Sequence, residues 1–360
     1  MMKFFPATIV IATLVCQATV SAHNSFSCDY PRSYDRWQEA FLSGNGKTGI
    51  MVFGNPQHET VIFNSRHFNF PSDTKRTFAK VPRDTVEKIG RLCAEGRFKE
   101  ANNLAVSSSQ YRDGGDGNRH PGFALKIDMP DGGKPSRYMR SCDYSTGEIS
   151  VAWTDNNGAW KRRSFVSRDK DIAVFDITST NGRKVSCALS LELPEEANFP
   201  SGMTAENSND NTSIGIHVRY SHPMAHRGFD GVVRYKIDGG NSIVRNDTLF
   251  VDGADNVTLV ARLDTFSNGA SIIPEIRSSL SGITPGYSQL LQEHAAIHGD
   301  IFNRVSIDLG ADPSSRELPN ETLLAMQKED DKPVAALWER IFDSGRYHYL
   351  SSSSELTPPD

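Results

Sequence analysis

Short apolar segments that alternate with polar residues run from Trp37 to about Thr265, with Gly, Asn and Asp between them. Alternation with a period of two predicts strands with one buried face, and regular turns between them are typical of antiparallel sheets. The expected strands are Gly49–Phe53, Thr60–Phe63, Phe123–Met129, Gly147–Trp153, Trp160–Ser167, Ile172–Thr178, Lys184–Leu193, Gly215–Tyr220, Gly231–Ile237, Thr248–Val251 and Val257–Leu263. They predict a mainly β fold, a large antiparallel two-sheet β-sandwich (a supersandwich) over residues 23–280.

Helical periodicity interrupts and then replaces this pattern. Apolar spacing of three and four over Asp84–Cys93 and Phe98–Ala105 predicts an inserted helical hairpin. Beyond Pro285 the helical period persists, which predicts a helical linker over residues 281–360. Its expected elements are helices near Tyr287–Asn303, Thr322–Gln327 and Pro333–Tyr349 and a strand at Val305–Leu309.

The last expected helix carries an apolar face. Val334, Leu337, Trp338, Ile341 and Phe342 share it through their spacing. Such a face is stable only when another surface covers it.

The composition excludes several classes of function. The 360 residues are 38% hydrophobic and 23% charged, which is typical of a folded chain rather than a disordered one. Lys and Arg number 39 against 44 Asp and Glu, so the net charge is 39 − 44 = −5, without long runs of one sign. We therefore expect no nucleic-acid partner.

The first 22 residues predict export. Lys3 precedes an apolar run over Phe4–Val15, and Val20-Ser21-Ala22 fits a small-residue cleavage pattern. The run is too short to span a bilayer, which takes about 20 apolar residues. The expected location is periplasmic or extracellular, after cleavage near Ala22.

Four cysteines remain after that cleavage. Cys28, Cys93, Cys142 and Cys187 allow three pairings in an oxidising compartment, and the sequence selects none of them. Their wide spacing contains no C-x-x-C and matches no metal pattern. No metal site is expected on them.

Two other motifs suggest chemistry that their context does not support. Ser43–Thr48 resembles a phosphate-binding loop, but Phe41 occupies the position of its first Gly and strand-forming residues follow it, so a turn entering a strand is expected. His217, His222 and His226 lie close in sequence, yet their spacing around a proline disfavours convergence on one ion. We expect no metal and no cofactor.

The segment Phe63–Ser72 is a candidate sugar-binding loop. It follows an expected strand and mixes aromatic, amide, guanidinium and imidazole groups, which are the groups that contact sugar rings and hydroxyls. The candidate substrate-binding residues are Asn64, Arg66, His67 and Asn69. The alternative is a polar loop with two aromatic side chains packed beneath it.

Four segments carry a resemblance to a known family. Trp37–Gly54 reads W-Q-E-A-F-L-S-G-N-G-K-T-G-I-M-V-F-G, and an acid, Glu59, and an amide, Asn64, follow it. This resembles the opening of family 95 glycoside hydrolases, W-x-E-A-L-P-x-G-N-G-x-x-G-A-M-V-F-G, then an acid and an Asn. Three further segments resemble the family in the same order: Arg91–Ala101, Trp160–Ser167 and Ser344–Ser354.

The resemblance implies an architecture and an activity. The family joins an N-terminal β-sandwich, through a helical linker, to an (α/α) six-hairpin barrel, and it includes inverting α-L-fucosidases and α-L-galactosidases that need no cofactor. Its general acid, a Glu, and its base, an Asp, lie in the barrel. None of them maps onto this sequence, whose last residue, Asp360, stands where the barrel's segments should begin. The expected partner is a fucosylated or galactosylated glycan.

The sequence also departs from the family. Phe41–Ser43 replaces the usual Leu-Pro-x, and Asn64–Pro71 stands where many members have Asn-Glu-Asp-Thr-Leu-Trp. The second change leaves the sugar open.

Three interpretations follow. The first is a fragment or truncated form of a hydrolase, inactive alone; the second is a stand-alone sugar-binding or structural module. The third is a complete enzyme with an acid/base pair on the sandwich, although nothing selects one pair among 44 acids.

Overall fold

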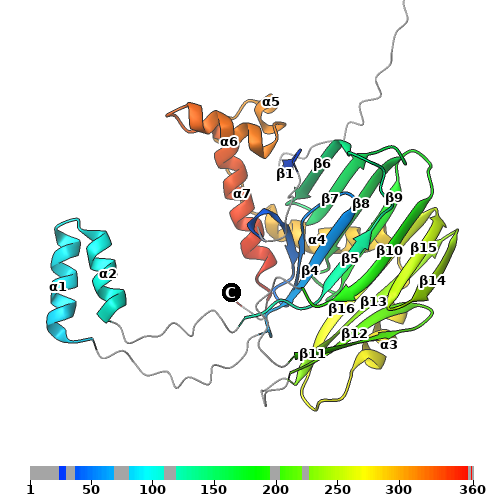
Figure 1. Cartoon of the computed structure of the whole chain (residues 1–360). Helices are drawn as coiled ribbons and strands as arrows, with labels where there is room; N and C mark the ends of the chain where they lie inside the picture. The colour runs from blue at the N-terminus through cyan, green and yellow to red at the C-terminus, as the bar shows by residue number, and fades with distance from the viewer. Residues whose placement is uncertain are drawn as a thin grey trace, which may run out of the picture.

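A computed structural model describes residues 24–29, 37–68, 81–108, 119–194, 203–220, 227–355 and 358. Their strands form two antiparallel sheets, so the expected β-sandwich is confirmed (Figure 1). The nine-stranded sheet has the order β1 (Asn24–Ser27), β6 (Ser136–Asp143), β7 (Glu148–Thr154), β8 (Ala159–Val166), β9 (Ala173–Ser179), β16 (Asn256–Phe266), β13 (Gly228–Asp238), β12 (Ser213–Tyr220) and β11 (Met203–Asn209). The seven-stranded sheet has the order β14 (Asn241–Arg245), β15 (Thr248–Ala254), β10 (Val185–Glu192), β5 (Ala124–Asp128), β4 (His58–Ser65), β3 (Thr48–Val52) and β2 (Phe41–Gly44).

Alternation of side chains places the core between the sheets. In β4, Val61 and Phe63 are buried while Ile62 and Asn64 between and after them are half-buried. Phe63 stacks on Phe123, with 4.3 Å between the ring centroids. Because successive residues of a strand point to opposite faces, this alternation is sufficient to set which side of each sheet is inside.

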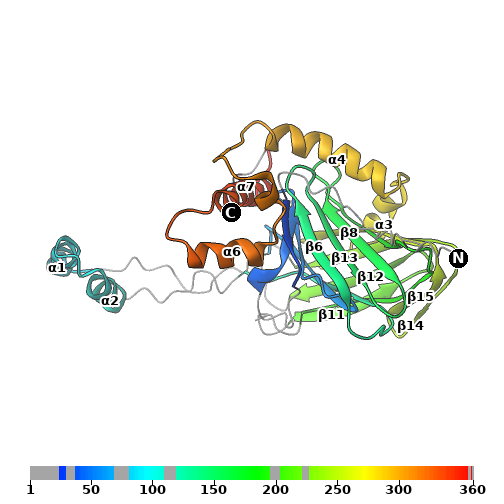
Figure 2. The ribbon, with the colours of Figure 1, turned by 90° about the horizontal axis from the view of Figure 1, so that it is seen from above.

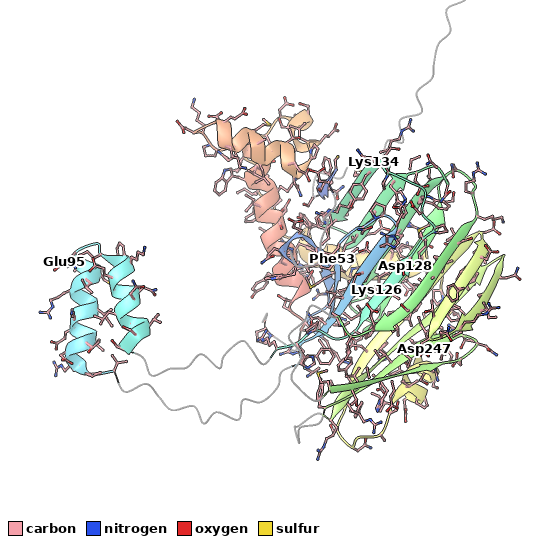
Figure 3. All side chains as sticks on the ribbon, in the orientation of Figure 1. Phe53, Glu95, Lys126, Asp128, Lys134 and Asp247 are labelled. Carbon is pink, nitrogen blue, oxygen red and sulfur yellow. The ribbon has the colours of Figure 1, made fainter. Side chains whose placement is uncertain are left out.

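Polar side chains occupy the other face of the seven-stranded sheet. Lys126 and Asp128 of β5 lie there, because Leu125 and Ile127 face the core (Figure 3). Lys126 Nζ donates to Thr60 Oγ1 at 3.0 Å, and Asp128 pairs with His58 Nδ1 at 2.9 Å.

Helices cover the outer face of the nine-stranded sheet. α3 (Ile273–Ser281) packs on β12, β13 and β16, and α4 (Tyr287–Phe302) packs on β9, as Figure 2 shows. α7 (Ala335–Ser351) lies beside β1 and β2 at one edge of the sandwich. The other helices are η1 (Trp37–Glu39), α1 (Arg83–Ala94), α2 (Phe98–Ser108), α5 (Pro313–Arg316) and α6 (Asn320–Glu329). The expected hairpin is confirmed, since α1 and α2 pack on each other.

The prediction of a strand at Val305–Leu309 was wrong. This segment has no regular secondary structure and pairs with no strand among the described residues. Side chains of α7 satisfy its backbone instead: Arg346 Nη1 donates to Val305 O at 2.5 Å, and Leu309 N donates to Glu339 Oε1 at 2.7 Å. Its alternating apolar residues remain exposed.

The domain limits expected at residues 22 and 280 remain predictions. Residues 1–22 lie outside the described part of the chain. α3 crosses residue 280, and both it and α4 pack on the sandwich, so the segment called a linker is attached to the sheet along much of its length.

The four cysteines carry free thiols, and none of the three possible pairings is formed. Cys28 and Cys93 are exposed, whereas Cys142 and Cys187 are buried. Burial raises the pKa of Cys187 to about 12 and raises that of Cys142 further. The two buried thiols are therefore unreactive core residues.

Candidate functional site

The candidate loop lies at one end of the seven-stranded sheet. Asn64 is half-buried and pairs with Gly49 across β3 and β4. Arg66 and His67 form the turn after β4, where Arg66 N donates to Lys47 O at 3.1 Å and His67 is exposed. Asn69 lies outside the described residues. The structure thus brings Asn64, Arg66 and His67 beside the turn that joins β2 and β3.

The turn that joins β2 and β3 is built around Asn45. Its Oδ1 accepts the backbone N–H groups of Lys47 and Thr48 at 3.0 and 2.8 Å, and its Nδ2 donates to Ser167 O at 2.9 Å. Gly46 adopts a φ of +82°, which favours glycine. The expected turn entering a strand is confirmed, because β3 follows it.

A charged cluster adjoins this turn. Lys47 Nζ lies 2.6 Å from Asp171 Oδ2 and 3.4 Å from Asp264 Oδ2. Burial alone would raise the pKa of Asp171, but Lys47, Asn45 and Thr48 hold it below its usual value. Asp171 is therefore an ionised structural acceptor rather than a proton donor.

The C-terminal end of α7 is fixed to the same turn. Gly46 N donates to Ser351 O at 2.9 Å, and a Cβ at Gly46 would lie 2.4 Å from Ser353 C. Arg168 donates to Leu350 O at 2.8 Å and to Ser353 O at 3.0 Å. The candidate loop therefore lies where the sandwich holds the end of α7.

Aromatic side chains support the loop from below. Phe68 is 2% exposed and stacks on His120, with 5.0 Å between ring centroids. His120 Nδ1 lies 2.8 Å from Pro121 O, which can only accept, so its Nε2 accepts the hydroxyl proton of Tyr220 at 3.0 Å. Burial lowers the pKa of His120 and raises that of Tyr220, in keeping with a neutral pair. His120 and Tyr220 lie far from the loop along the chain, so no local sequence pattern pointed to them.

The deeply buried carboxylate of Glu59 does not form a catalytic pair. Glu59 is 1% exposed, accepts from Gly54 N at 2.9 Å and pairs with Arg162 Nη2 at 2.8 Å. Burial raises its pKa, and Arg162 and the backbone N–H groups oppose that rise. The cavity that Glu59 lines encloses about 10 Å³, room for one water at most. Glu59 therefore has no access to a sugar.

The described residues also contain no cluster of His, Cys, Asp and Glu that could hold a metal ion. His217 pairs with Asp230 at 2.5 Å, and Asp230 in turn accepts from Ser271 Oγ and Ile272 N at the start of α3. His222 and His226 lie outside the described residues. None of the helices in the described ranges is long and apolar enough to cross a membrane.

Two family models match the chain. The model "Glycosyl hydrolase family 65, N-terminal domain" matches residues 27–268, and the model "Glycosyl hydrolase family 95 catalytic domain" matches residues 286–360. The second match begins at the start of α4, within the segment expected to be a linker.

Two curated proteins are similar to the chain. "Probable alpha-fucosidase A" of Aspergillus oryzae is 22% identical over 371 residues, which cover 96% of this chain and 50% of that protein. "Alpha-L-fucosidase 2" of Arabidopsis thaliana is 23% identical over 354 residues, which cover 88% of this chain and 41% of that protein. The chain thus spans about half the length of the curated relatives it matches.

Proposed function

Because the chain belongs to the glycosyl hydrolases of the family 95 type, with a family 65-type N-terminal domain, we propose that it is the N-terminal part of an exported enzyme that removes α-L-fucosyl or α-L-galactosyl groups from glycans. The sandwich supports the catalytic domain and, through the candidate loop at Asn64–His67, forms part of the wall of its pocket. The catalytic carboxylates lie outside this chain, which is inactive alone.

The exposed apolar surface of the C-terminal helices carries this proposal. Trp338 and Ile341 of α7 are 47% and 48% exposed, although their spacing is that of a core-facing stripe. Further exposed apolar side chains of the same region are Val305, Ile307, Leu309, Leu324, Met326 and Tyr349. Water-exposed apolar area of this extent favours contact with a further protein surface. We assign that surface to the rest of the catalytic domain, since residues 286–360 match only its beginning.

The proposed chemistry is a single displacement. One carboxylic acid protonates the leaving oxygen while a carboxylate activates a water on the opposite face of the sugar. Within the described chain, the buried Glu59 is held by Arg162 and cannot take either role. Export is part of the proposal through Lys3 and the apolar run that follows it, which lie outside the described residues.

The test is to extend the chain. The genomic sequence after the codon for Asp360 is read, and the protein that it encodes is assayed on 4-nitrophenyl α-L-fucoside and α-L-galactoside. The proposal predicts a continuing frame that encodes helical hairpins, and hydrolysis of at least one substrate with inversion. A folded extended protein that hydrolyses neither would contradict it.

His67→Ala in the extended enzyme tests the loop. Loss of one hydrogen bond to the sugar, about 0.5–1.5 kcal/mol, raises KM by about two- to tenfold and leaves kcat nearly unchanged. His58→Ala is the matched control, because His58 is also exposed but lies at the first residue of β4, at the opposite end of the strand from His67, against Asp128. An unchanged KM for His67→Ala would give the loop a purely structural role.

A further inference from the structure

A column of stacked rings joins α4 to the sandwich. His294, His298 and Phe302 follow at four-residue spacing on one face of α4, and His294 stacks on Phe165 of β8 with 5.1 Å between centroids. The rings of His294 and His298 lie 5.3 Å apart, and those of His298 and Phe302 6.2 Å apart. Tyr347 of α7 meets His298 edge-on at 5.6 Å. The rings of α4 therefore contact both the sheet and α7.

The hydrogen bonds require His294 to be neutral and show which nitrogen of His298 carries a proton. His294 Nδ1 lies 3.2 Å from Arg168 N, which can only donate, so this nitrogen is an acceptor without a proton. His298 Nε2 lies 2.8 Å from Tyr144 O, which can only accept, so Nε2 carries a proton; in the neutral ring that burial favours, Nδ1 has none. Protonation of His294 at Nδ1 would remove the bond from Arg168 N.

The surroundings oppose a positive charge. Both histidines are 1% exposed. Burial, the neighbouring His298 and Arg168 lower the pKa of His294 to about 3, and Asp169 and the Thr146 backbone oppose this. Burial and Arg168 lower the pKa of His298 to about 4, and the Tyr144 carbonyl and Asp143 oppose this. The other titratable groups around the column are Lys170, Glu293, Tyr144, Tyr347 and His348. Of these, Lys170 Nζ lies 2.7 Å from Glu293 Oε2.

We propose that this column is an acid-sensitive joint: protonation of His294 or His298 releases α4, and through Arg168 the end of α7, from an intact sandwich. Arg168 connects the two helices because its backbone donates to His294 while its guanidinium donates to Leu350 O and Ser353 O. A displaced α4 frees this backbone and loosens the contact with α7. The core between the sheets contains neither histidine and stays closed.

Hydrogen exchange on the full chain between pH 7 and pH 5 tests the joint, with rates corrected for intrinsic pH dependence. Each histidine that titrates only after opening lowers the protection of α4 by up to about 25-fold over this range. The proposal predicts that α4 and the end of α7 lose protection while β13 and β16 keep theirs. Unchanged protection of α4, or equal loss in β13 and β16, would overturn it.

Variants distinguish protonation of the two histidines from other effects of low pH on the fold. His294→Asn with His298→Gln keeps an acceptor and a donor near the original nitrogens but removes the titration, so α4 should keep its protection at pH 5. His58→Asn removes an exposed histidine and should lose protection as the unaltered chain does. Acid loss that persists in the double variant would contradict the joint.

Two single variants keep the test decisive if the double variant does not fold. His294→Asn and His298→Gln each remove one of the two titrations, so each should make the loss of α4 protection between pH 7 and pH 5 smaller, by up to about 25-fold. Full loss of protection in both single variants would overturn the assignment to these histidines.

Discussion

The sandwich and helix α7 differ in what they bury. Between the sheets, apolar side chains such as Phe63 and Phe123 are buried against each other. In α7, by contrast, Glu339, Arg340 and Asp343 are buried while Trp338 and Ile341 are about half exposed. The sandwich therefore buries its apolar faces inside, as a folded domain does. In the helical region, Leu337 of the apolar stripe is buried, but Trp338 and Ile341 face water. The proposed function explains this difference by a further protein surface that covers the two exposed side chains.

The buried polar face of α7 has local partners. Glu339 accepts from Arg316 Nε at 2.8 Å, and Arg340 donates to Leu318 O and Arg316 O, each at 2.8 Å. These bonds fix the segment between α5 and α6 on α7. Loop carbonyls and one Arg–Glu pair thus explain the burial of Glu339 and Arg340, and leave Trp338 and Ile341 free to contact another surface.

Among variants that compare the sandwich with the helical region, Glu59→Ala should change the free energy of unfolding most. It leaves Arg162 buried beside Trp153 without its carboxylate, which should lower the free energy of unfolding of the sandwich by about 3–5 kcal/mol. Urea unfolding measures it. Glu206→Ala is the control, since its pair with Arg219 is exposed and should contribute under about 1 kcal/mol. Equal effects of both variants would show that the sandwich does not depend on its buried pair.

Trp338→Ser gives the smallest expected effect. Loss of a half-exposed ring should change the unfolding free energy by less than about 0.5 kcal/mol and reduce self-association of the chain. Leu337→Ala, one position away but buried, should cost about 2–4 kcal/mol. If Trp338→Ser were as destabilising as Leu337→Ala, the exposed stripe would already be packed in solution.

Strands with strict alternation were predictable from the sequence, and others were not. β10 reads V-S-C-A-L-S-L-E and was expected, whereas β6, S-R-Y-M-R-S-C-D, was missed. Arg140 of β6 lies inside because it donates to Glu39 O and Phe53 O at 2.6 and 2.8 Å. A buried arginine supported by carbonyls from distant segments has no signature in the local pattern.

The candidate site shows the same limit. The residues of the Asn64 loop follow from their sequence alone, because a strand and a turn place them together. The contacts that fix the loop could not be predicted in this way, because Lys47, His120 and Arg168 lie in separate segments that meet only in the folded chain. The expected apolar face of α7 was correct as a pattern, and its exposure depends on tertiary contacts that the sequence does not reveal.

The most direct test of the account is the activity of this chain alone on 4-nitrophenyl α-L-fucoside. We expect no hydrolysis above the uncatalysed rate, because we place the catalytic carboxylates in the part of the enzyme that this chain does not include, and the buried Glu59 is held by Arg162. Hydrolysis by the purified 360-residue chain would contradict it and would place a catalytic pair on the sandwich or its helices.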